Sequence, residues 1–194
     1  MIHPDTELRH VDDTIGYGLF ATRFIPRGTF TWVHDDLDQI IDPQLQHRLP
    51  AELAALLYKY SYLEPRGRVL CWDHGRFVNH SCVPNCRSTG FDLEIAVRDI
   101  HPGDQVTDDY GSLNVDYEFE CRCGSPACRG TIRAADIVLY GDAWDREAVD
   151  AFRLAAAVGQ PLWPLLREKT DIERAFRGEI PVPSCRVHAL PASL

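Results

Sequence analysis

Short apolar segments broken by glycine and proline dominate the first half of the chain. Residues 8–34 carry β-branched and aromatic side chains, interrupted by Gly16, Gly18 and a turn at Pro26–Gly28. Runs of this kind, bounded by turn residues, are typical of short β-strands. The same pattern predicts further strands over 68–72, 93–98 and 104–107.

A helical pattern interrupts these predicted strands at 43–60. Its apolar side chains recur at helical spacing, and Pro50 suits the first turn of a helix. The apolar face would consist of Leu53, Leu56, Leu57 and Tyr60. We therefore expect a helical insert at this point of the chain.

The composition shifts towards helix-forming residues after Gly130. Residues 143–158 predict a helix with Asp142 as its N-cap and Gly159 as its stop. A proline-broken stretch and another helical segment follow, and residues 179–194 are predicted to be a tail. Many short strands followed by helices indicate an α+β protein, mainly β, with a C-terminal helical flank packed on the domain.

Composition adds limits on size and location. The 194 residues are 45% hydrophobic, which suits one domain with a core of its own. No apolar run approaches the roughly 20 residues that cross a membrane, and the first residues are too polar for a signal peptide. We therefore expect no membrane association, and a protein of the cytoplasm, or of the nucleus if its source is eukaryotic.

The charge balance bears on the partner. The formal net charge is −9, from 29 acidic and 20 basic residues. Direct nucleic-acid binding is therefore not expected. An acidic surface better suits a cationic partner, such as a basic protein or peptide.

Three of the seven cysteines lie close together at Cys121, Cys123 and Cys128. In a reducing compartment, clustered thiols suit a metal better than disulfides, and tetrahedral zinc takes four such ligands. The spacing leaves the fourth ligand open, with Cys82, Cys86, Cys71 and His80 as candidates. Four thiolates would make a closed structural site, whereas three would leave an open, catalytic position.

The segment Gly75–Cys86 combines an Asn-His pair, two cysteines and a Pro-Asn turn. A metal site, a Cys-His nucleophile or a binding loop could contain these residues. A nucleophile made of Cys82 and His80 is the weakest of these readings, because residues two apart need not be in contact. The glycines at 16 and 18 lack the third glycine of a dinucleotide site and indicate only a turn.

Four motifs, in order along the chain, resemble the SET family of protein-lysine methyltransferases. They are GYGLFATRFIPRGT (16–29), RFVNHSCVPNC (76–86), EIAVRDIHPGDQVTDDYG (94–111) and the post-SET-like CRCGSPACRGTI (121–132). The resemblance implies small, mostly antiparallel sheets, with the Asn-His segment threaded as a pseudoknot under a loop near Tyr110. It also implies three regions: a catalytic domain over 8–114, a post-SET zinc segment over 115–132, and a helical flank and tail over 133–194.

The activity implied by the resemblance is methyl transfer from S-adenosylmethionine (AdoMet) to the side-chain amine of a lysine in a protein. Tyr110 matches the catalytic tyrosine. Sulfonium is a good leaving group, so a hydroxyl that only positions the methyl group and the amine can suffice. A structural zinc ion would be bound by Cys82, Cys121, Cys123 and Cys128, with Cys86 as the runner-up for Cys82. Cys71 and Cys185 would be buried or tail thiols.

The resemblance also implies a set of AdoMet-binding residues. Gly18 would allow close backbone approach, the Asn79 carbonyl would accept from the ammonium of AdoMet, and the backbone at His80 would pair with adenine. Ser61 and Tyr62 match a cofactor-contacting Ser-Tyr of many members, although a core aromatic stripe explains them equally well. The full set is Tyr17, Gly18, Ser61, Tyr62, Arg76, Phe77, Asn79, His80 and Tyr110.

The segment before Tyr110 departs from the family pattern. Asp108 stands where the family has an aromatic residue that helps to set the number of methyl groups added. An acid there could attract a lysine ammonium or hold a water, so the degree of methylation is not predicted. The alternative functions are a catalytically silent SET-like module that binds cationic peptides and a zinc hydrolase with an open metal position.

Overall fold

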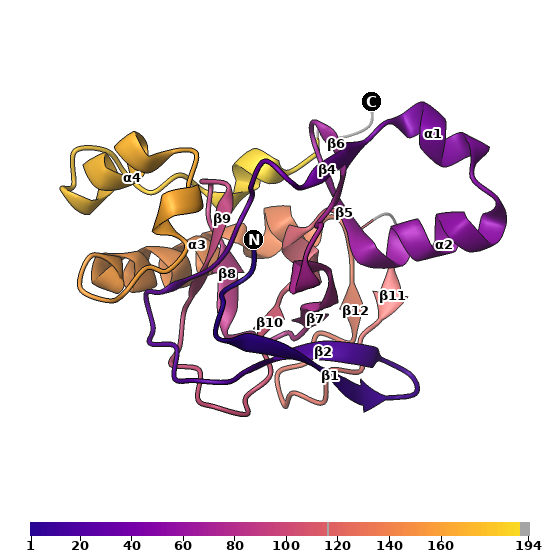
Figure 1. Ribbon diagram of the computed structural model, residues 1–194, viewed down its shortest axis with the longest axis horizontal. Helices are drawn as coiled ribbons and strands as arrows, with labels where there is room; N and C mark the ends of the chain where they lie inside the picture. Colours follow the sequence, from indigo (N-terminus) through magenta and orange to yellow (C-terminus); the bar gives the residue numbers. More distant parts are fainter. Residues whose placement is uncertain (116, 191–194) are drawn as a thin grey trace.

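The computed structural model describes residues 1–115 and 117–190 (Figure 1). Within these ranges the strands form small sheets of two or three strands each. The strands are β1 (Thr6–Asp12), β2 (Gly16–Ala21), β3 (Phe30–Val33), β4 (Gln39–Ile41), β5 (Ser61–Glu64), β6 (Gly67–Leu70), β7 (Asn79–His80), β8 (Cys86–Ser88), β9 (Leu93–Ala96), β10 (Thr107–Asp108), β11 (Phe119–Glu120) and β12 (Thr131–Ile132). The helices are α1 (Pro43–Arg48), α2 (Ala51–Tyr60), α3 (Asp136–Ala155) and α4 (Lys169–Phe176).

The pairing of the strands is almost entirely antiparallel. β1 pairs with β2, β11 pairs with β12, and two three-stranded sheets have the orders β3-β9-β8 and β4-β6-β5. The parallel pair joins β7 to β10, with Asn79 opposite Thr107 and His80 opposite Asp108. The predicted α+β fold of small antiparallel sheets is therefore confirmed, and the Asn-His segment lies directly beside the segment that leads to Tyr110.

The largest core lies between the β3-β9-β8 sheet and the C-terminal helices (Figure 1). Phe30 of β3 stacks against Phe176 of α4 with ring centroids 6.3 Å apart, and Phe152 of α3 packs against both rings. Gly28 lets this approach happen, because its φ is +95° and a Cβ there would lie 2.9 Å from Cβ of Leu154. The C-terminal helices thus complete the hydrophobic core of the sheet.

The helical insert is broken where a single helical segment was predicted. α1 ends before Leu49, whose ψ of 141° is extended, as expected for a residue that precedes a proline. α2 begins directly after Pro50. Its predicted apolar face is not buried, and Leu53 and Leu56 are each 52% exposed. In Figure 1 the two helices project at the opposite end of the molecule from α3 and α4.

The first C-terminal helix differs from its prediction at the N-terminal end. α3 begins at Asp136 and not at 143, so Asp142 is an internal helical residue and not the cap. The buried positions Ile137, Gly141 and Trp144 continue the helical stripe of the later turns. Gly141 concealed this from the sequence pattern, since glycine is usually unfavourable inside a helix. It lies against Arg186, whose Nε would be 2.9 Å from a Cβ at this position.

The segment predicted as a tail is packed as far as the structure describes it. Gly90 donates from its backbone N–H to Pro183, and Cys185 is 1% exposed against Ile137 and Trp144. Residues 191–194 lie outside the described residues. Within the two described ranges, no helix is long and apolar enough to cross a membrane.

Candidate active site

A cavity of about 330 Å³ opens where the short sheets meet. This volume lies at the small end of the range typical of small-molecule sites. Its lining comes from β2, β5, β9, β10 and the segments around Phe77 and Tyr110. Of the residues predicted for the cofactor, those lining the cavity are Tyr17, Ser61, Tyr62, Arg76, Phe77, Asn79 and Tyr110. Gly18 and His80 lie outside the lining.

Gly18 allows two side chains to approach the β2 backbone. A Cβ on Gly18 would lie 2.2 Å from Nε2 of Gln105 and 2.7 Å from Nδ2 of Asn79. The Asn79 amide donates to the carbonyl of Tyr17 at 3.1 Å. This bond leaves the Asn79 carbonyl oxygen as the acceptor available to a ligand.

Aromatic rings form one wall of the cavity. Phe77 packs edge-on against Tyr17 and Tyr60, with centroid distances of 6.2 and 5.2 Å. Arg76 lies over the Phe77 ring and donates to the carbonyls of Cys71 and Trp72. Arg76 therefore also holds the local backbone.

The Ser61 and Tyr62 hydroxyls already have partners inside the protein. Ser61 donates to the carbonyl of Leu57 at the end of α2 and accepts from Arg68 at 3.2 Å. Tyr62 lies 3.2 Å from Oε1 of Glu64, and burial raises its pKa well above the usual value. These contacts favour the structural reading of both residues.

Tyr110 is held at both its backbone and its hydroxyl group. Its backbone N–H donates to Nδ1 of His80 at 3.1 Å, and its hydroxyl donates to the carbonyl of Val78 at 2.8 Å. Burial, reinforced by the charge of Asp108, raises the pKa of the Tyr110 hydroxyl above its ordinary value. The hydroxyl is therefore neutral at physiological pH, which suits a positioning group better than a general base.

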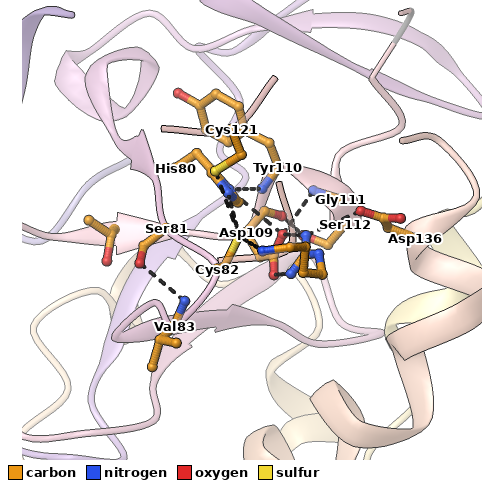
Figure 2. A network of polar contacts seen from close by, with 12 residues as sticks. His80, Ser81, Cys82, Val83, Asp109, Tyr110, Gly111, Ser112, Cys121 and Asp136 are labelled. Atoms are coloured by element: carbon orange, nitrogen blue, oxygen red, sulfur yellow. Dashed lines mark hydrogen bonds and ion pairs between the residues drawn. The ribbon is translucent and has the colours of Figure 1, made fainter. Parts of the chain in front are cut away.

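Asp109, next to Tyr110, is the centre of a buried ion-pair network that the sequence did not reveal (Figure 2). Both oxygens of Asp109 accept from Arg129, at 2.6 and 2.7 Å, and Arg87 adds a bond of 3.1 Å. Asp136 of α3 binds the same Arg129 at 3.2 Å. Burial alone would raise the pKa of Asp109, but the two arginines lower it below its ordinary value. The cysteine segment is thereby tied to the Tyr110 segment.

Arg129→Met should lower the free energy of unfolding at pH 7 by about 3 kcal/mol, because removing one partner leaves a buried charge poorly compensated. The lowered Asp109 pKa means that this stabilisation exists above about pH 4 and is lost as pH falls through the folded-state pKa. Urea unfolding from pH 7 to pH 2 measures both effects.

The matched control for this variant is Arg122→Met. Arg122 pairs with Glu120 at 2.7 Å, but both side chains are largely exposed, so its loss should change the free energy of unfolding very little. Equal costs for the two arginines would contradict the assigned role of the buried network.

The four predicted zinc ligands gather in one cluster. Sγ of Cys82 and Sγ of Cys121 are 3.7 Å apart, close to the roughly 3.8 Å edge of a tetrahedron with Zn–S bonds of 2.3 Å. Cys123 lies within 4.8 Å of both sulfurs. Cys128 packs against the same cluster, with its Sγ 3.5 Å from the carbonyl oxygen of Cys121. The donor set fits a closed thiolate site.

His80 is the other residue close enough to bind a metal in this cluster (Figure 2). Its Nδ1 accepts from the Tyr110 N–H, so the ring proton lies on Nε2. That nitrogen is 3.3 Å from Sγ of Cys82 and can donate to it. Arg129 directs its backbone N–H to the same sulfur at 3.4 Å. This hydrogen bond favours His80 as a donor to Cys82, and Cys128, which is not among the four ligand residues within 4.8 Å of one another, stays the predicted fourth ligand.

The remaining cysteines lie elsewhere. Cys86 is fully buried in the core that contains Leu19 and Ile100, so it is not a ligand in this arrangement. Cys71 lines the cavity and Cys185 lies against α3. Every cysteine among the described residues is a free thiol.

A second group of potential ligands is already occupied by a cation. His34, Glu64 and Asp92 lie within 4.8 Å of one another. Nη2 of Arg66 lies 3.2 Å from His34, 2.6 Å from Glu64 and 3.3 Å from Asp92. An arginine in this position takes the place that a metal ion would need.

Two acids at the cavity were not singled out together by the sequence. Asp108 and Glu94 both line the cavity, from β10 and β9. In the sequence, Asp108 stands out as a departure from a motif, whereas Glu94 is an ordinary polar residue of a predicted strand. Only the pairing of sheets brings the two carboxyl groups together.

Comparisons with known proteins identify the domain that contains most of this cavity. The family model described as SET domain matches residues 16–111. Human histone-lysine N-methyltransferase SETD1B is 27% identical over 134 residues, covering 63% of this chain and 7% of the relative. ASHH2 of Arabidopsis thaliana, a histone-lysine N-methyltransferase, is 30% identical over 146 residues, covering 66% of this chain and 8% of the relative. The chain thus spans under a tenth of the length of these relatives.

Among solved structures, the methyltransferase domain of human SETMAR, a histone-lysine N-methyltransferase, superposes with a TM-score of 0.45 at 20% identity. The match covers 68% of this chain and 58% of that chain. The matched region 16–111 holds Tyr17, Asn79, Asp108 and Tyr110, and the chain belongs to the SET domain family.

Proposed function

We propose that the protein transfers a methyl group from AdoMet to the side-chain amine of a lysine in a basic protein. The observation that carries this proposal is the cavity shared by Asn79, Phe77 and Tyr110, all within the SET domain. The relatives named above are histone-lysine N-methyltransferases, which makes histone tails the first substrates to test. The net charge of −9 favours a cationic partner of this kind.

The residues of this cavity suit a sulfonium cofactor. Asn79 can accept from the ammonium group of AdoMet, and the aromatic wall of Tyr17 and Phe77 can pack against its apolar atoms and attract its positive sulfur. When bound, AdoMet supplies the electrophilic methyl group. Tyr110 would position the incoming amine, with its own hydroxyl oriented by the Val78 carbonyl.

Four cysteines would hold a structural zinc ion: Cys82, Cys121, Cys123 and Cys128. This ion would fix the cysteine segment beside the cavity wall, where Phe119 packs against His80 and Tyr110. With four thiolates the metal has no open position, which disfavours the zinc-hydrolase alternative.

The test is methyl transfer itself. The protein is incubated with core histones and AdoMet carrying a labelled methyl group, and the products are analysed by mass spectrometry. Mono-, di- or trimethylated lysine on any histone supports the proposal. A protein that binds AdoMet and basic peptides but transfers no methyl group to histones or to lysate proteins is the silent module, which the intact set of Asn79, His80 and Tyr110 does not favour.

Asn79→Ala should weaken AdoMet binding about tenfold and lower the free energy of unfolding by about 1 kcal/mol, because a hydrogen bond to Tyr17 is lost with the acceptor for the cofactor. Calorimetric titration with AdoMet and urea unfolding measure the two effects. Asn85→Ala is the matched control for stability: it removes buried hydrogen bonds to Gln105 and Thr107 outside the cavity lining. Unchanged AdoMet affinity in Asn79→Ala would make this asparagine purely structural.

A further inference from the structure

The feature that the proposed function leaves unexplained is a pair of acids inside the cavity. Asp108 is 1% exposed and lines the cavity from β10. Strand alternation explains its direction: its neighbour Thr107 turns to the opposite side, where it bonds Asn85. Glu94 of β9 lines the same cavity and is accessible only in part.

The carboxyl group of Asp108 has another acid as its hydrogen-bond neighbour. Neither Oδ1 nor Oδ2 receives a well-aligned hydrogen bond from an N–H or hydroxyl donor of the residues that the structure describes, and the group that contacts Asp108 is the carboxyl group of Glu94. Buried carboxyl groups are normally paired, because burial without a partner is costly. A buried carboxyl group that faces a cavity beside a second acid is therefore suited to a ligand that donates hydrogen bonds.

The charged groups around Asp108 include one arginine, whose ion pairs are formed with other acids. The neighbouring groups are Glu94 on β9, Arg87 on β8, His80 on the paired strand β7, and the adjacent Asp109 and Tyr110. Arg87, the cation among them, is bound to Asp109 and to Glu147 of α3. Asp108 thus faces a second acid and a neutral tyrosine hydroxyl.

Two acids at close range favour the sharing of one proton. Burial raises the pKa of Asp108 to about 6, although a hydrogen bond with Glu94 works in the opposite direction. Burial and the charge of Asp108 raise the pKa of Glu94 well above its ordinary value. At neutral pH the pair therefore carries about one negative charge, which can accept a proton or bind a cation.

The pair also lies near the hydroxyl group that would position the amine. The charges of Asp108 and Glu94 both raise the pKa of Tyr110, and all three residues line one cavity. A lysine side chain that reaches Tyr110 is the cationic ligand of suitable size. Its ammonium group has a reference pKa of about 10.4 and must lose a proton before it can attack a methyl group.

We propose that Asp108, together with Glu94, binds the ammonium group of the substrate lysine and accepts its proton. The inference rests on the proposed methyl transfer. One N–H bond of the ammonium breaks and an O–H bond forms on the carboxylate. The amine lone pair then forms a bond to the methyl carbon of AdoMet, and the carbon–sulfur bond breaks with its electrons passing to sulfur. The carboxylic acid returns its proton to solvent before the next turnover.

The test compares the wild type with Asp108→Asn, which preserves shape and removes the proton acceptor. Methyl transfer to core histones is measured at saturating AdoMet from pH 6 to pH 10. The wild-type rate should level off above about pH 7. The variant should be about 100-fold slower at pH 7.5 and should gain about tenfold per pH unit up to pH 9.5, because solution must then deprotonate the lysine.

Two readouts separate this role from a structural one. Asp108→Asn should retain AdoMet affinity, and its thermal midpoint should equal or exceed that of the wild type, because a buried negative charge beside other acids is lost. Glu94→Gln should show the same pH trend with a smaller loss. Asp150→Asn, on the exposed side of α3, is the control and should follow the wild-type profile. A profile in Asp108→Asn that matches the wild type, or that is lower by one factor at every pH, overturns the proposal.

A binding measurement decides the question without turnover. n-Butylamine, the analogue of the lysine side chain, is titrated at pH 7.5 into the AdoMet-bound protein, with n-butanol as the neutral reference. Preference for the amine in the wild type, lost in Asp108→Asn, supports the inference even if no protein is methylated, and only the proposed function then fails. Equal affinity for amine and alcohol in the wild type overturns the inference, whether or not histones are methylated.

Discussion

Tyr110→Phe should reduce the turnover number for methyl transfer about 100-fold while it changes AdoMet affinity less than about threefold. A 100-fold loss corresponds to about 2.7 kcal/mol of transition-state stabilisation. The hydroxyl removed by this change is fixed by its bond to the Val78 carbonyl. In the proposed role this hydroxyl positions the amine, so its contribution should appear in the transition state and not in cofactor binding.

The neutral state of this hydroxyl makes the prediction specific. Burial keeps the Tyr110 proton in place at physiological pH, so its loss should lower the rate by a similar factor between pH 7 and pH 9. The Asp108→Asn variant should instead recover at high pH. The two pH profiles therefore separate a positioning hydroxyl from a proton acceptor in the same cavity.

Tyr140→Phe is the matched control for this experiment. Tyr140 lies on α3 outside the cavity, and its ring, which Arg129 contacts, remains in the variant. Turnover in this control should equal that of the wild type. Near-wild-type turnover in Tyr110→Phe at saturating substrate would remove Tyr110 from the mechanism.

The sequence predicted strands such as β2 and β9 because their signals are local, and it missed several of the very short ones, such as β7 and β11. The runs at 16–21 and 93–96 contain the β-branched and apolar residues that a short sheet buries. The start of α3 was missed for an equally local reason. Gly141 weakens the helical pattern in the sequence, although the close packing of Arg186 against this position requires a glycine. Pro50 marked a helix start, but its effect on Leu49 breaks the insert in two.

The residues of the candidate site could be predicted only where they belong to a short sequence motif. The residues around Asn79 and Tyr110 came from short motifs, and seven of the nine predicted cofactor residues do line one cavity. The Asp109–Arg129 pair joins residues 20 positions apart, and Glu94 meets Asp108 through sheet pairing. No local pattern encodes such contacts, because they depend on how β9, β10 and the cysteine segment come together.

The predicted ligand role of Cys82 shows the same limit of local sequence patterns. Spacing alone left Cys82, Cys86, Cys71 and His80 as candidates for the fourth ligand. The fold separates them. Cys82 follows β7 into the cysteine cluster, Cys86 of β8 is buried in a separate core, and His80 uses its Nδ1 to accept from the Tyr110 backbone. The hydrogen bond from the Tyr110 backbone to His80, which no cysteine spacing could reveal, favours His80 as a hydrogen-bond donor to Cys82 over His80 as a metal ligand.

The second large effect concerns the metal. The protein should contain one zinc ion per chain, and Cys82→Ser should abolish both zinc binding and methyl transfer. A structural zinc site couples metal binding to local folding with apparent free energies of about 10 kcal/mol or more. The residues that should loosen first are 117–132, where β11 and β12 form a pair only two residues long. The large core of Phe30 and Phe152 lies elsewhere and should remain folded.

Zinc content by plasma mass spectrometry, hydrogen exchange over 117–132 and methyl transfer measure these effects together. Mild chelation of the wild type should reproduce Cys82→Ser, with activity lost before the main core unfolds. Cys71→Ser, Cys86→Ser and Cys185→Ser are controls that should keep the zinc, because those thiols lie outside the cluster.

His80→Gln and Cys128→Ser decide which residue is the fourth zinc ligand. If His80→Gln loses zinc and Cys128→Ser retains it, the imidazole is the ligand. Full activity in a metal-free protein would remove zinc, and with it the cysteine segment, from the account of this site.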